Sequence, residues 1–90
     1  MLERRLCIPN TLGLHARAAA KLVRLANGFK STIILRRDDA GITANAKSIL
    51  SVLNIAAARG CEISVTTEGA DEEPAMEAIQ DLIVKGFGEI

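Results

Sequence analysis

His15 is the single histidine in this chain of 90 residues, and Arg17 follows two positions later. Residues 9–13 have the composition of a loop, and residues 16–23 that of a helix. His15 is therefore expected at a helix N-terminus, where free backbone N–H groups and the helix dipole attract anions. An imidazole nucleophile beside an anion site and an arginine indicates phosphoryl transfer through a phosphohistidine. A histidine that merely caps the helix is the alternative left open.

Three groups beside His15 fit this chemistry. The backbone N–H groups of Ala16 and Arg17 are candidates for binding phosphoryl oxygens, and the Arg17 guanidinium can add charge-assisted hydrogen bonds. Gly13 would let the preceding loop approach without a Cβ in the way. The sequence has no Walker-type nucleotide cradle, so the chain is not expected to use ATP itself. A stand-alone enzyme is not expected either, because no carboxylate orienter or second nucleophile is evident.

Composition restricts the class of protein further. Residues 1–90 are expected to form a single domain, since a chain this short has room for one core. Zero formal net charge and an aromatic content of 2% argue against nucleic acid as a partner. No apolar run approaches a membrane span and the start does not resemble a secretory signal, so a cytoplasmic location without membrane insertion is expected. Cys7 and Cys61 lack metal-ligand companions, so neither a metal site nor another cofactor is expected.

Hydrophobic periodicity predicts seven elements in the order β-α-β-β-α-β-α. Strands are expected at residues 2–8, 31–37, 42–44 and 61–68, with the first at a sheet edge. Helices are expected at residues 16–26, after Ser48 and from Asp71 onward, and residues 86–90 are expected to fray. Alternating strands favour a four-stranded antiparallel sheet with the three helices on one face, an α+β open-faced sandwich.

Two surface features bear on partners. Arg17, Lys21 and Arg24 follow helical spacing and form a basic stripe that begins beside His15. A solvated basic face is an equally weighted interpretation of this stripe. The helix expected after residue 48 is short and very apolar, so part of it should remain exposed as a partner surface. Periodicity leaves open the alternative that its first residues, Ile49 and Leu50, are simply buried.

Two motifs resemble those of a known family. Residues 10–17, Asn-Thr-Leu-Gly-Leu-His-Ala-Arg, resemble the phosphorylation-site signature of the HPr family, the histidine phosphocarriers of the bacterial phosphoenolpyruvate-dependent phosphotransferase system. Residues 45–50, Asn-Ala-Lys-Ser-Ile-Leu, resemble the second signature of this family, around its regulatory serine. The order and spacing of the motifs also match, and the resemblance covers essentially the whole chain. Ala18 departs from it, because the family usually has proline there.

The resemblance implies an HPr-like open-faced β-sandwich and a phosphoryl carrier rather than an enzyme. It implies that Nδ1 of His15 accepts a phosphoryl group from phosphorylated enzyme I and passes it to EIIA-type proteins, in sugar uptake or regulation. It also implies phosphorylation of Ser48 by an HPr kinase/phosphorylase, and a transcriptional regulator is a further expected partner. A monomer is expected. The implied docking face lies on the first two helices and includes Leu12, Ala20, Lys21, Arg24, Lys47, Ile49, Leu50 and Leu53.

Three alternatives remain at this stage. The carrier could serve the carbohydrate branch or the nitrogen-regulatory branch, which the ending Gly-Phe-Gly-Glu at residues 86–89 resembles. A second hypothesis is a regulatory binding module of the same fold that carries no phosphate, although the presence of His15 argues against it. For Ser48, the alternative to a modification site is an ordinary helix N-cap.

Overall fold

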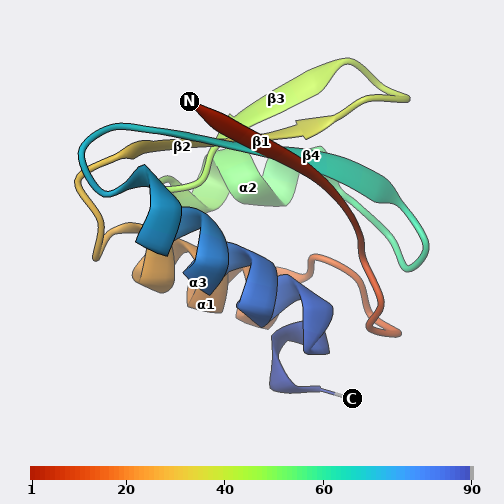
Figure 1. The fold of residues 1–90 in the computed structure, drawn as a ribbon. Coiled ribbons are helices and arrows are strands. Elements are labelled where there is room, and N and C mark those ends of the chain that lie inside the picture. The colour runs from red at the N-terminus through yellow and green to blue at the C-terminus, as the bar shows by residue number, and fades with distance from the viewer. Residues whose placement is uncertain (90) are drawn as a thin grey trace.

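A four-stranded antiparallel sheet carries three helices on one face, as predicted (Figure 1). The computed structural model describes residues 1–89. The strands are β1 (Leu2–Cys7), β2 (Thr32–Arg37), β3 (Ile42–Asn45) and β4 (Glu62–Glu68), in the spatial order β1-β4-β2-β3. The helices are α1 (Ala16–Ala26), α2 (Ile49–Ile55) and α3 (Glu72–Val84), followed by the 3₁₀ turn η1 (Gly86–Gly88). The predicted element order and α+β open-faced sandwich are confirmed.

The sheet places β4 in its interior and β1 at an edge. Strand β4 pairs with β1 on one side and with β2 on the other, both antiparallel. Most of β1 is exposed, as expected of an edge strand. The predicted alternation along β4 holds for its apolar residues, but Ser64 is buried as well, where its hydroxyl donates to Asp38 at 2.9 Å. A buried hydroxyl needs such a partner, so the interior strand accommodates it without an unpaired polar group.

The hydrophobic core lies between the sheet and the helices. Helix α1 contributes mainly small side chains, which let it pack closely; its buried residues are Ala18, Ala19, Leu22 and Ala26. Helix α3 contributes larger ones, namely Ala75, Met76, Ile79 and Ile83. The inward face of the sheet meets them with Ile33, Leu35, Ile63 and Val65. This packing fixes the position of α1, and with it the residue at its N-terminus.

The segment after α3 is folded, so the prediction that it frays is wrong for Gly86–Glu89. Phe87 is almost fully buried and packs into the core. Its backbone carbonyl accepts a hydrogen bond of 2.7 Å from Nζ of Lys21 on α1. The buried Phe87 ring and the hydrogen bond from Lys21 hold the chain end against α1. The remaining residue of that prediction, Ile90, lies outside the described residues.

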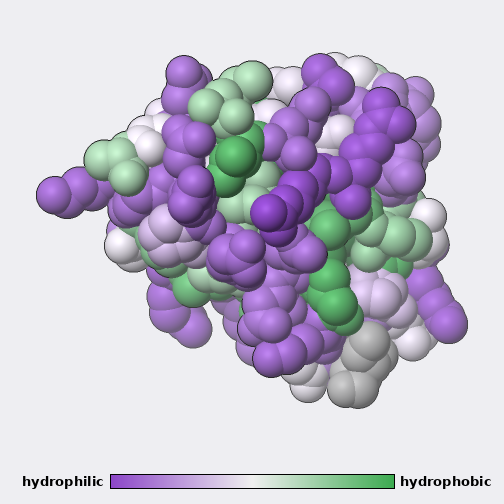
Figure 2. Space-filling view, in the orientation of Figure 1, coloured by the Kyte–Doolittle hydropathy of each residue, from purple (hydrophilic) through white to green (hydrophobic). Residues whose placement is uncertain are grey.

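The face formed by α3 and β1 is largely hydrophilic, with small hydrophobic patches between the polar side chains (Figure 2).

In the described part of the chain, residues 1–89, none of the helices has the length and apolar character needed to cross a bilayer.

Candidate functional site

His15 occupies the N-cap of α1, as the sequence predicts. Its backbone is extended, and its carbonyl accepts the first helical hydrogen bond, from Ala19 N–H at 2.8 Å. Its ring nitrogen Nδ1 lies 3.3 Å from the backbone N–H of Arg17, which donates to it. A ring nitrogen that accepts a hydrogen bond carries a lone pair, so the ring proton of neutral His15 belongs on Nε2. In this tautomer Nδ1 carries the lone pair that a nucleophile needs.

A carboxylate contacts the other ring nitrogen. Oε2 of Glu89 lies 2.6 Å from Nε2 of His15 and 3.3 Å from Nε of Arg17. The expectation that no carboxylate orients the histidine is therefore wrong. The sequence pattern does not reveal Glu89, because it lies 74 positions from His15 and follows a segment without helical or strand periodicity. The family-like ending at residues 86–89 was the available signal, but a motif does not reveal which side chain it contacts.

Asn10 connects the loop before α1 to the Glu89 carboxylate. Its side chain is fully buried, and Nδ2 donates to Oε1 of Glu89 and to the Gly13 carbonyl, both at 2.8 Å. Its Oδ1 has no hydrogen-bond partner within residues 1–89. Because both contacts of Nδ2 are acceptors, the amide orientation follows from the network. Asn10 thus fixes the loop before α1 and the chain end relative to each other.

Hydrogen bonding favours the ionised form of the Glu89 carboxylate. The Asn10 amide makes the largest contribution, and it holds the pKa of Glu89 below the usual 4.5. Partial burial acts in the opposite direction, while His15 and Arg17 lower the pKa further. The side chain of Glu89 is 15% exposed, and that of His15 is 23% exposed. The ring consequently faces a fixed negative charge on one side and keeps a route to solvent on the other.

Gly13 brings the loop before α1 into contact with the loop after α2. Its φ of +66° lies in the left-handed region, and a Cβ there would come within 2.5 Å of the Ala57 carbonyl oxygen. The next residue, Leu14, donates its N–H to that same oxygen at 2.8 Å. The predicted reason for a glycine, close approach without a Cβ, is confirmed, and the neighbour is the backbone at Ala57 and Ala58.

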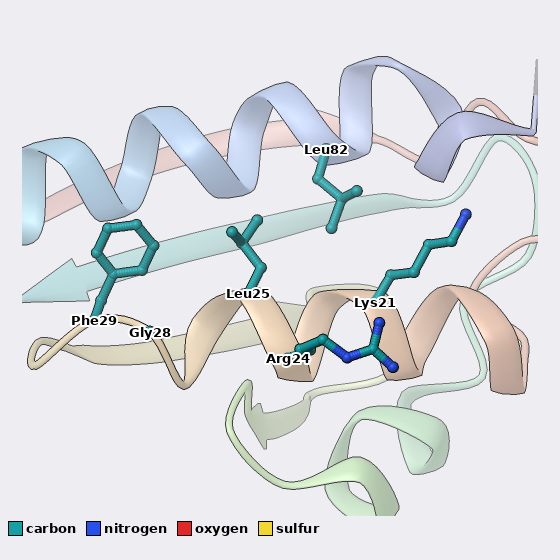
Figure 3. A pocket seen from close by; sticks show the side chains of 6 residues that line it. All are labelled: Lys21, Arg24, Leu25, Gly28, Phe29 and Leu82. Atoms are coloured by element: carbon teal, nitrogen blue, oxygen red, sulfur yellow. The ribbon is translucent and has the colours of Figure 1, made fainter.

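The basic stripe on α1 divides into residues with different contacts. Arg17 contacts Glu89, and Lys21 extends toward the segment after α3 (Figure 3), where it binds the Phe87 carbonyl. Arg24 is exposed and borders a hollow of about 510 Å³ between α1 and α3, which Leu25, Gly28, Phe29 and Leu82 also line. A solvated face describes Arg24, Lys21 holds the segment after α3, and Arg17 is largely exposed with one contact to Glu89.

The predicted docking residues differ in accessibility. Leu12, Ile49 and Leu50 are exposed large hydrophobic residues, and Leu50 retains 77% of its accessible surface. The alternative that Ile49 and Leu50 are buried is therefore wrong. Ala20 and Leu53 are half-buried, and the Lys47 amine is engaged by the Phe29 carbonyl at 2.7 Å. Exposed apolar residues are thus present on α2 and in the loop before α1, while their use in docking stays a prediction.

Ser48 is the N-cap of α2 by position but not by bonding. Its carbonyl accepts from Val52 N–H at 3.0 Å, which places it at the start of the helix. Its hydroxyl makes no capping hydrogen bond. The interpretation of Ser48 as an ordinary side-chain cap is therefore wrong, because its half-buried hydroxyl does not bond to the N-terminus of the helix.

A histidine at a helix N-terminus, on an open-faced sandwich, is the arrangement expected of a phosphoryl carrier. A family model described as the PTS HPr component phosphorylation site matches residues 2–85. The chain belongs to the HPr family of the phosphotransferase system, whose members carry phosphoryl groups and are not catalytic enzymes.

Relatives named as phosphocarriers match nearly the whole chain. The phosphocarrier protein HPr of Cupriavidus necator is 46% identical over 89 residues, which span 99% of this chain and 98% of the relative. The phosphocarrier protein NPr of Proteus mirabilis is 42% identical over 86 residues, 96% of this chain and 94% of the relative. A crystal structure of HPr from Thermoanaerobacter tengcongensis superposes with a TM-score of 0.93 at 40% identity, covering 100% and 99% of the two chains. Solved relatives include an HPr dimer, so the expected monomer stays a prediction.

Proposed function

We propose that this phosphocarrier accepts a phosphoryl group on Nδ1 of His15 from phosphorylated enzyme I and delivers it to an EIIA-type protein. The observation that carries the proposal is the orientation of the ring. Nδ1 accepts from the Arg17 N–H at the start of α1, while Nε2 faces the Glu89 carboxylate. The lone pair of Nδ1 is therefore directed to the end of the helix where N–H groups and the dipole favour an incoming phosphoryl group.

Two groups support the phosphoryl group in this proposal. The Arg17 guanidinium is largely exposed, and its contact with Glu89 is a single hydrogen bond of 3.3 Å, so it can turn toward phosphoryl oxygens. The Arg17 N–H that now donates to Nδ1 is released when Nδ1 becomes bonded to phosphorus. Together with the Ala16 N–H, it then provides donors for the new oxygens.

Docking in this proposal uses exposed apolar residues of the loop before α1 and of the first turn of α2. Leu12, Ile49 and Leu50 would contact enzyme I and the acceptor in turn, with Arg24 supplying positive charge at the edge. Ser48 lies directly before Ile49, so a phosphate on Ser48 would bring negative charge into this surface. A kinase that modifies Ser48 would therefore regulate access to His15.

The test is phosphorylation by enzyme I and phosphoenolpyruvate, followed by mass spectrometry at neutral pH. The expected product is an acid-labile phosphate on the peptide that contains His15. The control is His15→Ala, which should accept none. An unchanged phosphate yield in His15→Ala would exclude His15 as the acceptor.

The nitrogen-regulatory branch is a second candidate, because the relatives include NPr as well as HPr proteins. The two candidates share the chemistry at His15 and differ in the acceptor. Rates of transfer from the phosphorylated chain to an EIIA protein of each branch separate them. We expect the carbohydrate-branch acceptor to be the faster one, and faster transfer to the nitrogen-branch acceptor would assign the chain to that branch.

A further inference from the structure

We propose that Glu89 is a positioning residue for phosphoryl transfer, which holds the ring proton of His15 on Nε2 and stabilises the charge that the ring gains during attack. This inference rests on the proposed function of His15. It adds a residue from the opposite end of the chain to the transfer chemistry. It also gives the folded chain end a purpose beyond packing.

The contacts of the imidazole define the first part of this role. Oε2 of Glu89 lies 2.6 Å from Nε2, a distance typical of a strong, charge-assisted hydrogen bond. An ionised carboxylate only accepts hydrogen bonds, so it requires a proton on Nε2. The N–H of Arg17 likewise requires a lone pair on Nδ1. The two contacts select the same tautomer from opposite sides of the ring.

The charge that develops during transfer defines the second part. As Nδ1 attacks, its lone pair forms the new N–P bond, and the N–P bond of the phosphorylated donor breaks with its electron pair going to the donor nitrogen. The Nε2–H bond remains intact, so the His15 ring gains one positive charge. The Glu89 carboxylate faces that charge at hydrogen-bond distance and stabilises it. The same proton assists transfer from phosphorylated His15 to the acceptor. A ring that keeps its proton on Nε2 is a better leaving group when the N–P bond at Nδ1 breaks.

The chain end holds Glu89 with contacts that are independent of His15. Oε1 accepts from the buried Asn10 amide at 2.8 Å, and the Glu89 backbone N–H donates to the Gly86 carbonyl at 2.9 Å. Phe87, two residues earlier, is buried, and Lys21 binds its carbonyl. A carboxylate restrained on both its side chain and its backbone is preorganised, so little reorganisation accompanies the transfer.

The test compares Glu89→Ala and Glu89→Gln with the wild-type chain. The control is Asp81→Ala, which also removes one carboxylate from the last part of the chain but breaks only the exposed ion pair with Lys85. Two measurements are made on each variant: steady-state phosphorylation by enzyme I as a function of carrier concentration, and ¹H–¹⁵N spectra of the His15 ring. Thermal melts verify that each variant is folded.

We expect Glu89→Ala to reduce kcat roughly 10- to 100-fold, the range typical of partners that orient a reactive histidine, with KM unchanged. Its spectrum should lose the protected Nε2–H signal through exchange with water. Glu89→Gln retains an acceptor without the charge, so it should keep that signal and show an intermediate kcat. Asp81→Ala should match the wild type in both measurements.

A wild-type kcat in Glu89→Ala, a change confined to KM, or an equal loss in Asp81→Ala would each overturn the inference. A folded Glu89→Ala that retains a protected Nε2–H signal would also overturn it, whatever its rate. If instead the wild-type chain takes no phosphate on His15, the proposed function itself fails, and that failure is distinguishable because it does not depend on the variants.

Discussion

A single carboxylate oxygen serves two functional side chains. Oε2 of Glu89 accepts from Nε2 of His15 and from Nε of Arg17, so the guanidinium lies beside the ring in the unphosphorylated chain. The Arg17 side chain is 66% exposed, and an exposed ion pair of this kind contributes little to stability. Arg17 can therefore exchange its contact with Glu89 for one with the phosphoryl group at small cost. Its contribution should be to the rate of transfer rather than to folding.

Arg17→Ala should slow phosphorylation by enzyme I at saturating carrier concentration. Loss of a charge-assisted hydrogen bond in the transition state corresponds to about 1.5–3 kcal/mol in the activation free energy. Steady-state kinetics measure it, with Arg24→Ala as the comparison, because Arg24 is exposed on the same helix and should affect KM alone. If Arg17→Ala instead raises KM and leaves kcat intact, the guanidinium acts in docking and not on the moving charge.

At the scale of elements, the local pattern predicts α1 to the residue and fails at the chain end. The periodicity of residues 16–26 and the stop at Asn27 are properties of neighbouring residues. The turn η1 depends on tertiary contacts, since Phe87 is buried in the core and its carbonyl accepts from Nζ of Lys21 on α1. No window of residues 86–90 contains that information. Exposure of Ile49 and Leu50 could not be decided from periodicity for a related reason, because α2 is only two turns long.

Gly13→Ala should destabilise the fold more than Gly41→Ala does. Both glycines have nearly the same left-handed φ, +66° and +65°, but a Cβ at Gly41 meets nothing within 4 Å. Gly41→Ala should cost about 1–2 kcal/mol of unfolding free energy for the backbone conformation alone. Gly13→Ala should cost roughly a further 1–3 kcal/mol, because its Cβ meets the Ala57 carbonyl. Denaturant unfolding of both variants measures the difference, and equal losses would show that the loop contact has no energetic weight.

Ser48→Asp should impair phosphorylation of His15 by enzyme I without unfolding the chain. The substitution places a negative charge beside the exposed residues Ile49 and Leu50, and the serine hydroxyl makes no capping bond to lose. Ser48→Asn is the matched control, since asparagine has the shape of aspartate but no charge. Transfer rates and thermal melts are measured on both. Wild-type rates in Ser48→Asp would mean that this surface does not contact enzyme I.

For the whole molecule, two hydrogen-bonded connections join distant parts of the chain. At one end of α1, Asn10 and Glu89 connect the beginning of the chain to its end. At the other end, the Asp71 carboxylate accepts from the backbone N–H groups of Lys30 and Ser31, both at 2.8 Å, and from the Ser31 hydroxyl. The sequence pattern places Asp71 in the first turn of the last helix, whereas the structure places it one position earlier, at the N-cap, and the pattern does not reveal its partner 40 positions away. Side chains paired across such separations are what the sequence alone leaves undetermined.

Asp71 should make stability fall in acid. The Ser31 hydroxyl and the Lys30 N–H lower the pKa of Asp71 from 3.8 to about 2. Because the folded chain prefers the ionised form, the stabilisation is complete above about pH 3.8 and is lost as the pH falls through about 2. Unfolding free energy measured across this window should decline less steeply in Asp71→Ala than in the wild type. Superimposable profiles would mean that Asp71 does not contribute to the acid sensitivity of the fold.

Half of the candidate site follows from the sequence and half from the fold. His15, Arg17 and Gly13 lie within five residues, so a motif and a helix boundary place them together. Asn10 belongs to the same motif, whereas Glu89 reaches it only through the tertiary fold, in which the buried Phe87 and its contact with Lys21 place the chain end. The sequence therefore predicts His15 as the nucleophile, and the fold adds the Glu89 carboxylate that contacts its ring.

The most direct test of the account is the nitrogen to which phosphorus becomes bonded. The chain, labelled with ¹⁵N, is phosphorylated by enzyme I and phosphoenolpyruvate, and the ³¹P–¹⁵N coupling is measured at neutral pH. Because Nδ1 carries the lone pair and Nε2 faces Glu89, the account predicts coupling to Nδ1 of His15. Coupling to Nε2, or phosphate on any residue other than His15, would contradict it.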